Sequence, residues 1–157
     1  MGRTIRDATP ADAALVHALI VELAVYEREP DAVEATPASL EAQLRAEVPP
    51  FRCLVLEDEG EGVGFALYFP TYSTWRGLPG IHLEDLYVRP AFRGRGHGKA
   101  LLAELARRTE ALGGGRLEWA VLDWNQPAID FYEALGAVAQ DQWRTFRLDG
   151  EALARLR

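Results

Sequence analysis

Cysteine is almost absent from this chain of 157 residues, which contains only Cys53. A single cysteine cannot form an internal disulfide, so the chain is not a small disulfide-stabilised scaffold. Cys53 lies in the largely apolar run 51–56, and no sequence signature of an activated cysteine surrounds it. We therefore expect Cys53 to be a buried strand residue rather than a catalytic thiol.

Long hydrophobic runs are also missing. No apolar stretch approaches the ~20 residues that a bilayer-spanning helix needs, and residues 1–5 lack the charged-then-apolar pattern of a targeting segment. We therefore expect a cytoplasmic protein that does not enter a membrane. The three histidines, His17, His82 and His97, lack the spacing of metal ligands. The sequence consequently predicts no metal site.

Positive charge is scarce overall, with 17 Lys and Arg residues against 24 Asp and Glu residues and a net charge of -7. This balance argues against a protein whose main role is binding nucleic acid. The charge is unevenly distributed, because acids dominate residues 21–61, whereas in residues 86–109 six basic residues face only Glu104. One region therefore suits a cation and another suits an anion.

The composition is that of an ordinary globular protein, with 48% hydrophobic and 26% charged residues. The length fits one domain, which we expect to span residues 1–157. Apolar periodicity, helix start signals and turn residues predict an α/β order of elements with a mixed sheet. Strands are expected at residues 3–7, 52–57, 63–69, 81–88, 117–122 and 138–148, a loop at 70–80, and helices at 9–26, from 36 to before Pro49, 98–112, 127–135 and 149–156.

The strongest motif is Arg93-Gly94-Arg95-Gly96-His97-Gly98, which follows the expected strand 81–88 and leads into the expected helix 98–112. The strand, helix and strand from residue 81 to 122 should form a right-handed parallel unit. The three glycines allow close backbone approach with successive N–H groups pointing the same way. The helix N-terminus adds positive potential, so a diphosphate is the natural ligand.

Other phosphate loops fit this motif poorly. A Walker loop would need glycine at position 93 and serine or threonine at position 100, where this chain has Arg93 and Ala100. A dinucleotide fingerprint needs a different glycine spacing. Taken alone, the loop leaves one alternative open, a glycine-rich surface turn.

The pattern Arg93-x-x-Gly96-x-Gly98 after a strand that ends in Val88 resembles the acetyl-CoA motif of the GNAT N-acetyltransferases. Over nearly its full length the chain resembles the diamine acetyltransferase (spermidine/spermine N1-acetyltransferase) family. The shared landmarks are Glu22-Leu23-Ala24-x-Tyr26-Glu27, Gly64-Phe65-Ala66-x-Tyr68, Thr71-Tyr72-x-x-Trp75, Leu83-Glu84-Asp85-x-x-Val88, Trp124-Asn125-x-Pro127, Phe131-Tyr132 and Trp143-Arg144. The resemblance implies a mixed, mostly antiparallel sheet flanked by helices, acetyl-CoA as cosubstrate, and a homodimer.

The resemblance also implies which residues bind the cosubstrate. They are Leu86, Tyr87, Val88, Arg93, Gly94, Arg95, Gly96, His97, Gly98, Asn125, Pro127, Ala128 and Tyr132. The first three would lay backbone groups along the pantetheine arm, the loop would hold the pyrophosphate, and the residues from 125 to 128 would line the other side. Within the loop, His97 is expected to contribute its backbone rather than its imidazole.

Tyr132 matches the catalytic tyrosine of the family. A phenol with a pKa of about 10 stays protonated at neutral pH and can give a proton to the departing thiolate of coenzyme A. The alternative is a purely structural residue that packs beside Phe131.

Glu84 matches the carboxylate that the family is proposed to use as a general base. A primary amine with a pKa of about 10.4 is mostly protonated at pH 7, so a proton acceptor helps its attack on the thioester. A role only in binding the cation is the alternative. Glu84 adjoins Asp85 on the expected strand, where neighbours point to opposite faces unless a bulge redirects one of them.

The resemblance further implies a substrate site of carboxylates and aromatic faces, which suit an extended cation. Its residues are Tyr26, Glu27, Trp75, Glu84, Asp141 and Trp143. Two positions depart from the family: Ser73 stands where a polyamine-contacting acid is expected, and Glu118 replaces a histidine. The acceptor is therefore left open between a diamine or polyamine and a shorter, thialysine-like amino acid.

The expected activity is transfer of an acetyl group to a primary amine of a small cationic molecule, by direct attack in a ternary complex, with no nucleic-acid or membrane partner. Two alternatives stay open. One is acetylation of a protein lysine or N-terminus, because a lysine is also a cation. The other is a non-catalytic sensor of acyl-CoA, against which the presence of Tyr132 and Glu84 argues.

Overall fold

The computed structural model describes residues 2–157 and contains two compact units, the first ending at Ala120 and the second comprising Val121–Arg157. The first unit is built on a five-stranded sheet in the order β1-β2-β3-β4-β5. In the described residues its strands are β1 (Arg3–Asp7), β2 (Arg52–Asp58), β3 (Glu61–Ser73), β4 (Leu78–Val88) and β5 (Leu117–Trp119). The first three pairings are antiparallel and β4 pairs with β5 in parallel, so the expected mixed, mostly antiparallel sheet is confirmed.

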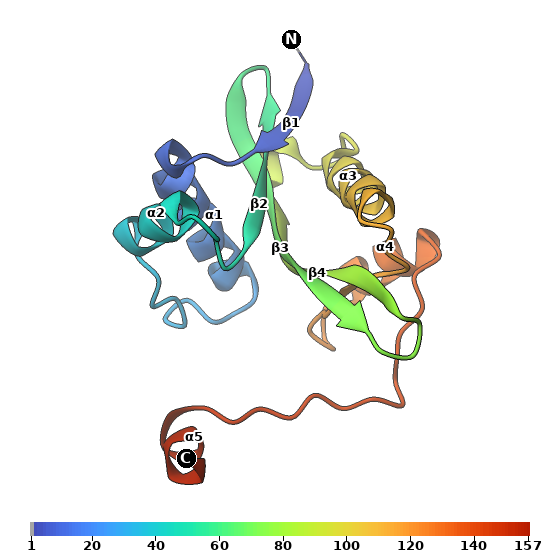
Figure 1. The fold of residues 1–157 in the computed structure, drawn as a ribbon. Helices are drawn as coiled ribbons and strands as arrows, with labels where there is room; N and C mark the ends of the chain where they lie inside the picture. Colours follow the sequence, from blue (N-terminus) through green and yellow to red (C-terminus); the bar gives the residue numbers. More distant parts are fainter. Residues whose placement is uncertain (1) are drawn as a thin grey trace. The chain divides into compact units, whose positions relative to one another are not determined.

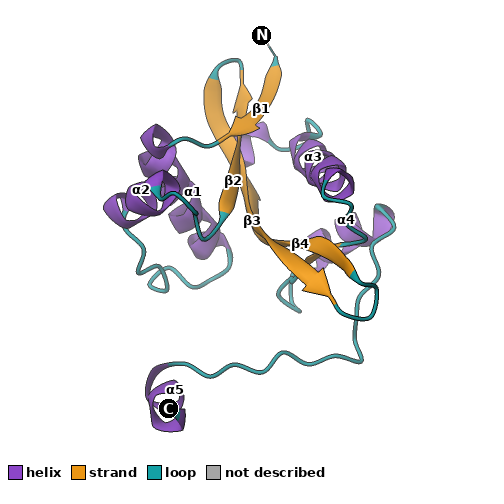
Figure 2. Cartoon of the chain, viewed as in Figure 1, coloured by secondary structure: helices purple, strands orange, loops and turns teal. Residues whose placement is uncertain are grey.

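Helices cover both faces of this sheet (Figure 1). In the first unit they are α1 (Ala13–Tyr26), α2 (Pro37–Arg45) and α3 (His97–Ala111), with short 3-10 turns at Pro10–Asp12 and Pro90–Phe92. Helices α1 and α2 lie on one side of the strands and α3 on the other (Figure 1). Helix α3 connects β4 to β5, as expected for the parallel unit. The second unit contains α4 (Gln126–Ala134) and α5 (Gly150–Leu156), joined by an extended segment (Figure 2).

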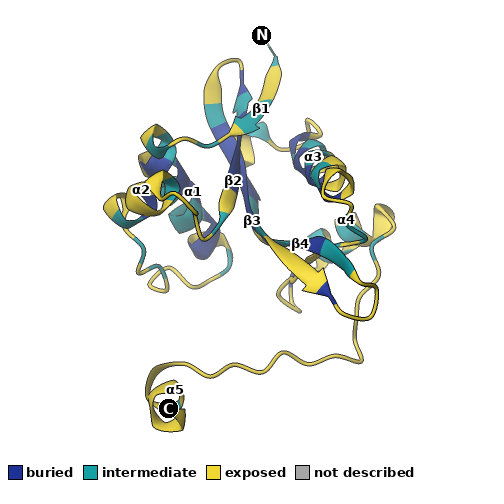
Figure 3. Cartoon of the chain, viewed as in Figure 1, coloured by how far each residue is buried: buried dark blue, intermediate teal, exposed yellow. Residues whose placement is uncertain are grey.

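The main core lies between α1, α2 and the sheet, where dark blue marks the buried residues in Figure 3. Leu19 of α1, Val55 of β2 and Phe65 of β3 are fully buried there. Cys53 belongs to the same core and is 4% exposed, so the expectation of a buried strand residue is confirmed. Burial raises the pKa of the Cys53 thiol to about 12, which keeps it protonated.

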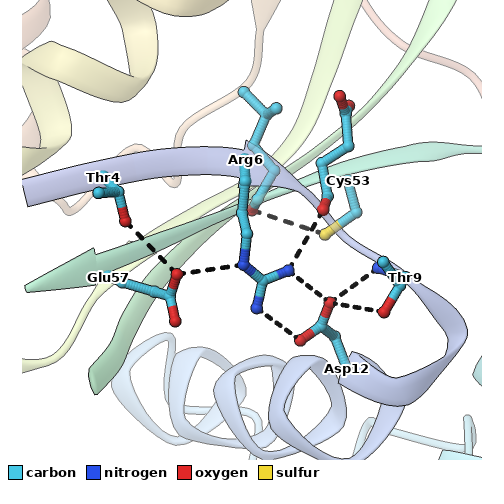
Figure 4. Close-up of polar contacts among 8 residues, drawn as sticks. Thr4, Arg6, Thr9, Asp12, Cys53 and Glu57 are labelled. Carbon is cyan, nitrogen blue, oxygen red and sulfur yellow. Dashed lines mark hydrogen bonds and ion pairs between the residues drawn. The ribbon is translucent and has the colours of Figure 1, made fainter. Parts of the chain in front are cut away.

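An ion-pair cluster joins the first two strands to the entry of α1 (Figure 4). The Arg6 guanidinium donates to both carboxylate oxygens of Asp12 at 2.8 and 2.9 Å and to Glu57 Oε1 at 3.1 Å. Asp12 Oδ2 also accepts from the backbone N–H of Thr9 at 2.7 Å. Hydrogen bonding to Arg6 lowers the pKa of Asp12 to about 2. The cluster therefore stays ionised at neutral pH and fixes where α1 begins.

Two expected boundaries differ from the structure. The expected loop at residues 70–80 is mostly strand, because β3 continues to Ser73 and β4 starts at Leu78. Pro70 pairs with Ile81 in this extension, although prolines and glycines there had suggested a loop. The strand expected at residues 117–122 ends at Trp119.

The prediction of a strand at residues 138–148 was wrong. No strand forms within this part of the second unit, and its apolar side chains are open to solvent, with Val138 77% and Phe146 91% exposed. An apolar pattern forms a strand only where its backbone N–H and C=O groups pair with a neighbour. The described segment has no such pairing.

Candidate functional site

The glycine-rich loop leads from the Pro90–Phe92 turn into α3. Gly94 and Gly96 adopt left-handed conformations, with φ of 78° and 79°, and Gly96 caps the N-terminus of the helix. Within residues 2–157, the backbone N–H groups of residues 94–99 donate to no protein acceptor. Successive unpaired N–H groups at a helix N-terminus form a concave site for an anion.

Both arginine side chains of this loop contact other parts of the first unit. Arg93 Nε donates to the backbone oxygen of Val88 at 2.8 Å, and its guanidinium lies 5.2 and 5.4 Å from the ring centroids of Tyr26 and Tyr87. Arg95 Nη1 pairs with Asp58 Oδ2 at 2.8 Å. Both guanidinium groups therefore stabilise the loop, and the backbone is what it presents to an anion.

The strand before the loop has an open edge. Strand β5 pairs only with Ile81–Leu83, so in the described part of the first unit the backbone of residues 84–88 has no strand neighbour on the β5 side. On its other side the same stretch pairs with β3, where Ala66 faces Leu86 and Gly64 faces Val88. Leu86, Tyr87 and Val88 thus offer backbone groups along which an extended chain can lie.

Three carboxylates gather in the first unit, and we call Glu27, Glu84 and Asp85 the acidic cluster. Burial raises the pKa of Glu27, and the charge of Glu84 raises it further. Burial raises the pKa of Asp85 to about 6, with additional contributions from Glu84 and Glu27. In residues 2–120 no arginine or lysine forms an ion pair with any of the three. The cluster therefore carries negative charge that a bound cation would neutralise.

A β-bulge places Glu84 in this cluster. Leu67 of β3 faces Asp85 and the next residue, Tyr68, faces Leu83, so Glu84 is an extra residue on β4. A bulge interrupts the alternation of side chains between the two faces of a sheet. The Glu84 side chain is 56% exposed, and its Oε2 lies 3.5 Å from His82 Nε2. The bulge explains how adjacent acids interact electrostatically.

Sequence reasoning missed Asp85 as a member of the site. Its only signal in the sequence is an acid on a largely apolar strand, and an acid next to Glu84 is unremarkable without knowledge of its burial. The raised pKa, about 6, brings the titration of Asp85 close to neutral pH. Such perturbed carboxylates concentrate in functional sites.

Other expected substrate residues of the first unit lie at its surface. Tyr26, at the end of α1, is 39% exposed, and Trp75, in the β3–β4 turn, is 87% exposed. Ser73 is buried, and its Oγ accepts from the backbone N–H of Arg76 at 3.2 Å, so it closes the turn. Glu118 forms an ion pair with Arg116 at 3.2 Å, which offsets its negative charge.

The remaining expected residues belong to the second unit. Asn125 caps α4, and its Oδ1 accepts from the backbone N–H of Ala128 at 3.3 Å, with Pro127 in the first turn. Tyr132 lies on the same helix, with its ring 5.6 Å from that of Phe131. The resemblance also implies that Asp141 and Trp143 belong to the substrate site. Both are exposed residues of the segment that joins α4 to α5.

None of the helices in residues 2–157 combines the length and the apolar character that crossing a membrane requires. Over the same residues, no group of three or more His, Cys, Asp or Glu side chains is arranged to hold a metal ion.

The mixed sheet, the crossover helix α3 and the glycine loop at its start form the arrangement that the resemblance to N-acetyltransferases implied. The Acetyltransferase (GNAT) family matches residues 16–137. The chain belongs to the GNAT family and is an acetyl-transferring enzyme.

Named relatives match nearly all of the chain. It is 40% identical to thialysine N-epsilon-acetyltransferase of Bos taurus, over 97% of this chain and 95% of the relative. It is 33% identical to L-ornithine N5-acetyltransferase of Arabidopsis thaliana, over 95% of this chain and 85% of the relative. Among solved structures, an integron cassette protein of V. cholerae has a TM-score of 0.82 at 24% identity, covering 99% of this chain and 98% of the other, and supports the fold.

Proposed function

We propose that this enzyme acetylates a primary amine of a small cationic molecule, with acetyl-CoA as the acetyl donor. The observation that carries the proposal is the acidic cluster, Glu27, Glu84 and Asp85, with which no arginine or lysine in residues 2–120 forms an ion pair. Thialysine and ornithine, the substrates in the names of two relatives, are both amino acids with a side-chain amine. Ser73 supports a short acceptor over a long polyamine, because an uncharged turn residue adds no carboxylate for a distant ammonium group.

Acetyl-CoA would bind along the open edge of β4 and over the glycine loop. The backbone groups of Leu86 to Val88 suit the amide-containing arm of the donor, as in the pairing of a peptide with a sheet edge. The N–H groups of residues 94–99 suit the pyrophosphate. Asn125, Pro127 and Ala128 are proposed to line the other side of the donor.

In the proposed reaction the neutral amine attacks the thioester carbonyl, so that a C–N bond forms and the C–S bond breaks. Glu84 accepts the amine proton, directly or through water, and Tyr132 gives its proton to the departing thiolate. Tyr26, Glu27, Trp75, Asp141 and Trp143 would surround the cation. Asp85 adds a second carboxylate beside Glu84.

Tyr132→Phe tests the proton donor. Loss of a general acid should lower kcat by about 100-fold and leave the KM for acetyl-CoA within a fewfold of the original value. Phe131→Leu, one residue away on the same helix, is the control for packing. If both variants keep full kcat, Tyr132 is a packing partner of Phe131 and not the acid.

The amine acceptor is tested by measuring coenzyme A release with a panel of ornithine, thialysine, lysine, putrescine, spermidine and a lysine-containing peptide. We expect the highest kcat/KM with the short amino acids. A preference for spermidine would overturn the short-acceptor assignment. Turnover only with a lysine-containing peptide would support protein acetylation, and binding of acetyl-CoA without any turnover would support a sensor.

Two further proposals concern the oligomeric state and the location of the enzyme. We propose a homodimer, on the resemblance to diamine acetyltransferases, which sedimentation at micromolar concentration would test. We also propose a cytoplasmic location, in keeping with its small-molecule substrates.

A further inference from the structure

A buried polar cluster lies beneath the glycine loop, and the proposed reaction does not use it. Asp58, the last residue of β2, is 8% exposed, and His97, the first residue of α3, is 5% exposed. His97 Nε2 lies 2.9 Å from Asp58 Oδ2, an oxygen that also accepts from Arg95 Nη1 at 2.8 Å. Hydrogen bonds from His97 and Arg95 lower the pKa of Asp58, so its carboxylate is ionised at neutral pH.

The first strand reaches the same cluster. Arg3 faces Asp58 directly in the antiparallel pairing of β1 with β2, so the two side chains extend from neighbouring positions on the sheet. Arg3 Nη1 lies 3.4 Å from His97 Nδ1 and donates to the backbone oxygen of Arg95 at 3.3 Å. A Cβ atom added at Gly96 would lie 3.6 Å from Arg3 Nη1, so Arg3 also packs against this glycine. Arg3 thus contacts the loop at both Arg95 and His97.

These contacts assign the hydrogen of the His97 ring. A guanidinium only donates hydrogen bonds, so Nδ1, which faces Arg3, must accept. The ring hydrogen is then on Nε2 and donates to the Asp58 carboxylate. Both ring nitrogens have partners, which fixes the orientation of the imidazole. The backbone of His97 supplies one of the unpaired N–H groups at the start of α3, so fixing its side chain also fixes part of the loop.

We propose that His97, held between Asp58 and Arg3 as the Nε2–H tautomer, is a positioning residue that keeps the loop in the shape that binds the acetyl donor. The proposal rests on acetyl-CoA being the donor. A positioning role of this kind acts on donor binding and not on the chemical step. Loss of the bond to Asp58 should therefore raise the KM for acetyl-CoA by about tenfold and leave kcat within about twofold.

His97→Leu and His97→Gln form a matched pair that separates the hydrogen bond from packing. Leucine fills the buried space without a donor, whereas the glutamine amide can donate to Asp58 in place of Nε2. We expect a tenfold rise in the KM for acetyl-CoA with leucine, and a value within about threefold of the original with glutamine. Equal KM values for the two variants, or a fall in kcat alone, would overturn the positioning role.

Two measurements do not require the leucine variant to fold. In protein with ¹⁵N-labelled histidine, the His97 signal, identified by its loss in His97→Gln, should show a protonated Nε2 and an unprotonated Nδ1. A proton on Nδ1 would overturn the assignment. Arg3→Met, at an exposed position, removes the donor to Nδ1 and should raise the KM for acetyl-CoA by about threefold. An unchanged KM would remove Arg3 from the proposal.

Calorimetry with acetyl-CoA distinguishes this proposal from the proposed function. If the unaltered enzyme does not bind acetyl-CoA, the assignment of the donor fails. If the unaltered enzyme binds it and His97→Leu binds it equally well, the donor assignment stands and only the role of His97 fails.

Discussion

The glycine loop and the acidic cluster lie in the same unit, but they differ in whether backbone groups or side chains are available to a charged ligand. In the loop, the guanidinium groups of Arg93 and Arg95 are occupied by Val88 and Asp58, and the unpaired groups are backbone N–H. In the acidic cluster the side chains carry the function, because Glu27 and Asp85 are desolvated beside Glu84. Donor binding at the loop should therefore depend most on backbone conformation. Activity at the acidic cluster should depend most on a single carboxylate.

The largest effect is expected in the acidic cluster, from Glu84→Gln. Removing the proposed proton acceptor should lower kcat by about 100-fold, because the amide cannot take the amine proton. The initial rate of coenzyme A release at saturating acetyl-CoA measures it. Glu41→Gln, on the exposed surface of α2 beside Arg45, is the control and should keep the full rate. If Glu84→Gln has the same kcat as the control, Glu84 is not the proton acceptor. It then either only binds the substrate or has no role.

In the loop, Gly96→Val should have the next largest effect. A β-branched residue at φ of 79° is strained by about 1–2 kcal/mol, so the loop should leave its observed shape. We expect the KM for acetyl-CoA to rise by about 30-fold. Gly96→Asn is the matched control, because asparagine tolerates this conformation and should cost much less. Similar KM values for both variants would show that the backbone shape at Gly96 does not govern donor binding.

Asp85→Asn separates stability from activity in the acidic cluster. The pKa of Asp85 in the folded chain, about 6, exceeds the ordinary aspartate value of 3.8. The folded state therefore binds the proton more tightly, and stability from this group falls as the pH rises from about 4 to 6. At pH 7.5 the variant should be more stable by roughly 1–2 kcal/mol, with a Tm about 4 °C higher.

Thermal melts at pH 7.5 and pH 4 test this sign. The gain in Tm should be largest at the higher pH and should shrink strongly at the lower one, where Asp85 is protonated in the folded state and only partly ionised in the unfolded chain. A gain of equal size at both pH values would mean that the carboxylate is not desolvated. Lower activity together with higher stability would indicate that the buried charge serves function.

The smallest effect is expected from Arg95→Gln. Its guanidinium pairs with Asp58 and packs over the Phe92 ring at 5.1 Å, so it supports the loop without presenting its charge to the donor. The KM for acetyl-CoA should rise by only about two- to threefold, and calorimetry with acetyl-CoA gives the same comparison at equilibrium. An increase larger than that of Gly96→Val would reverse the contrast between the two regions.

Local patterns in the sequence were enough to predict much of this molecule. Glycine spacing and helix signals located the loop and α3, and the order of elements predicted the parallel pairing of β4 with β5. The prediction of a strand at residues 138–148 was wrong because the pattern of apolar side chains cannot reveal whether the backbone has a strand partner. Asp85 was missed because burial and the bulge at Glu84 arise only when β3 and β4 pair. The roles of Tyr132 and Glu84 stay predictions.

The burial of Cys53 has a practical consequence for every rate measurement described above. The only thiol of the chain is 4% exposed and is held in its protonated, unreactive form. Thiol-reactive dyes added to the native enzyme should therefore develop colour only as coenzyme A is released. In denaturant without substrate, the same dyes should report the exposure of one thiol per chain, so a single reagent can follow both turnover and unfolding.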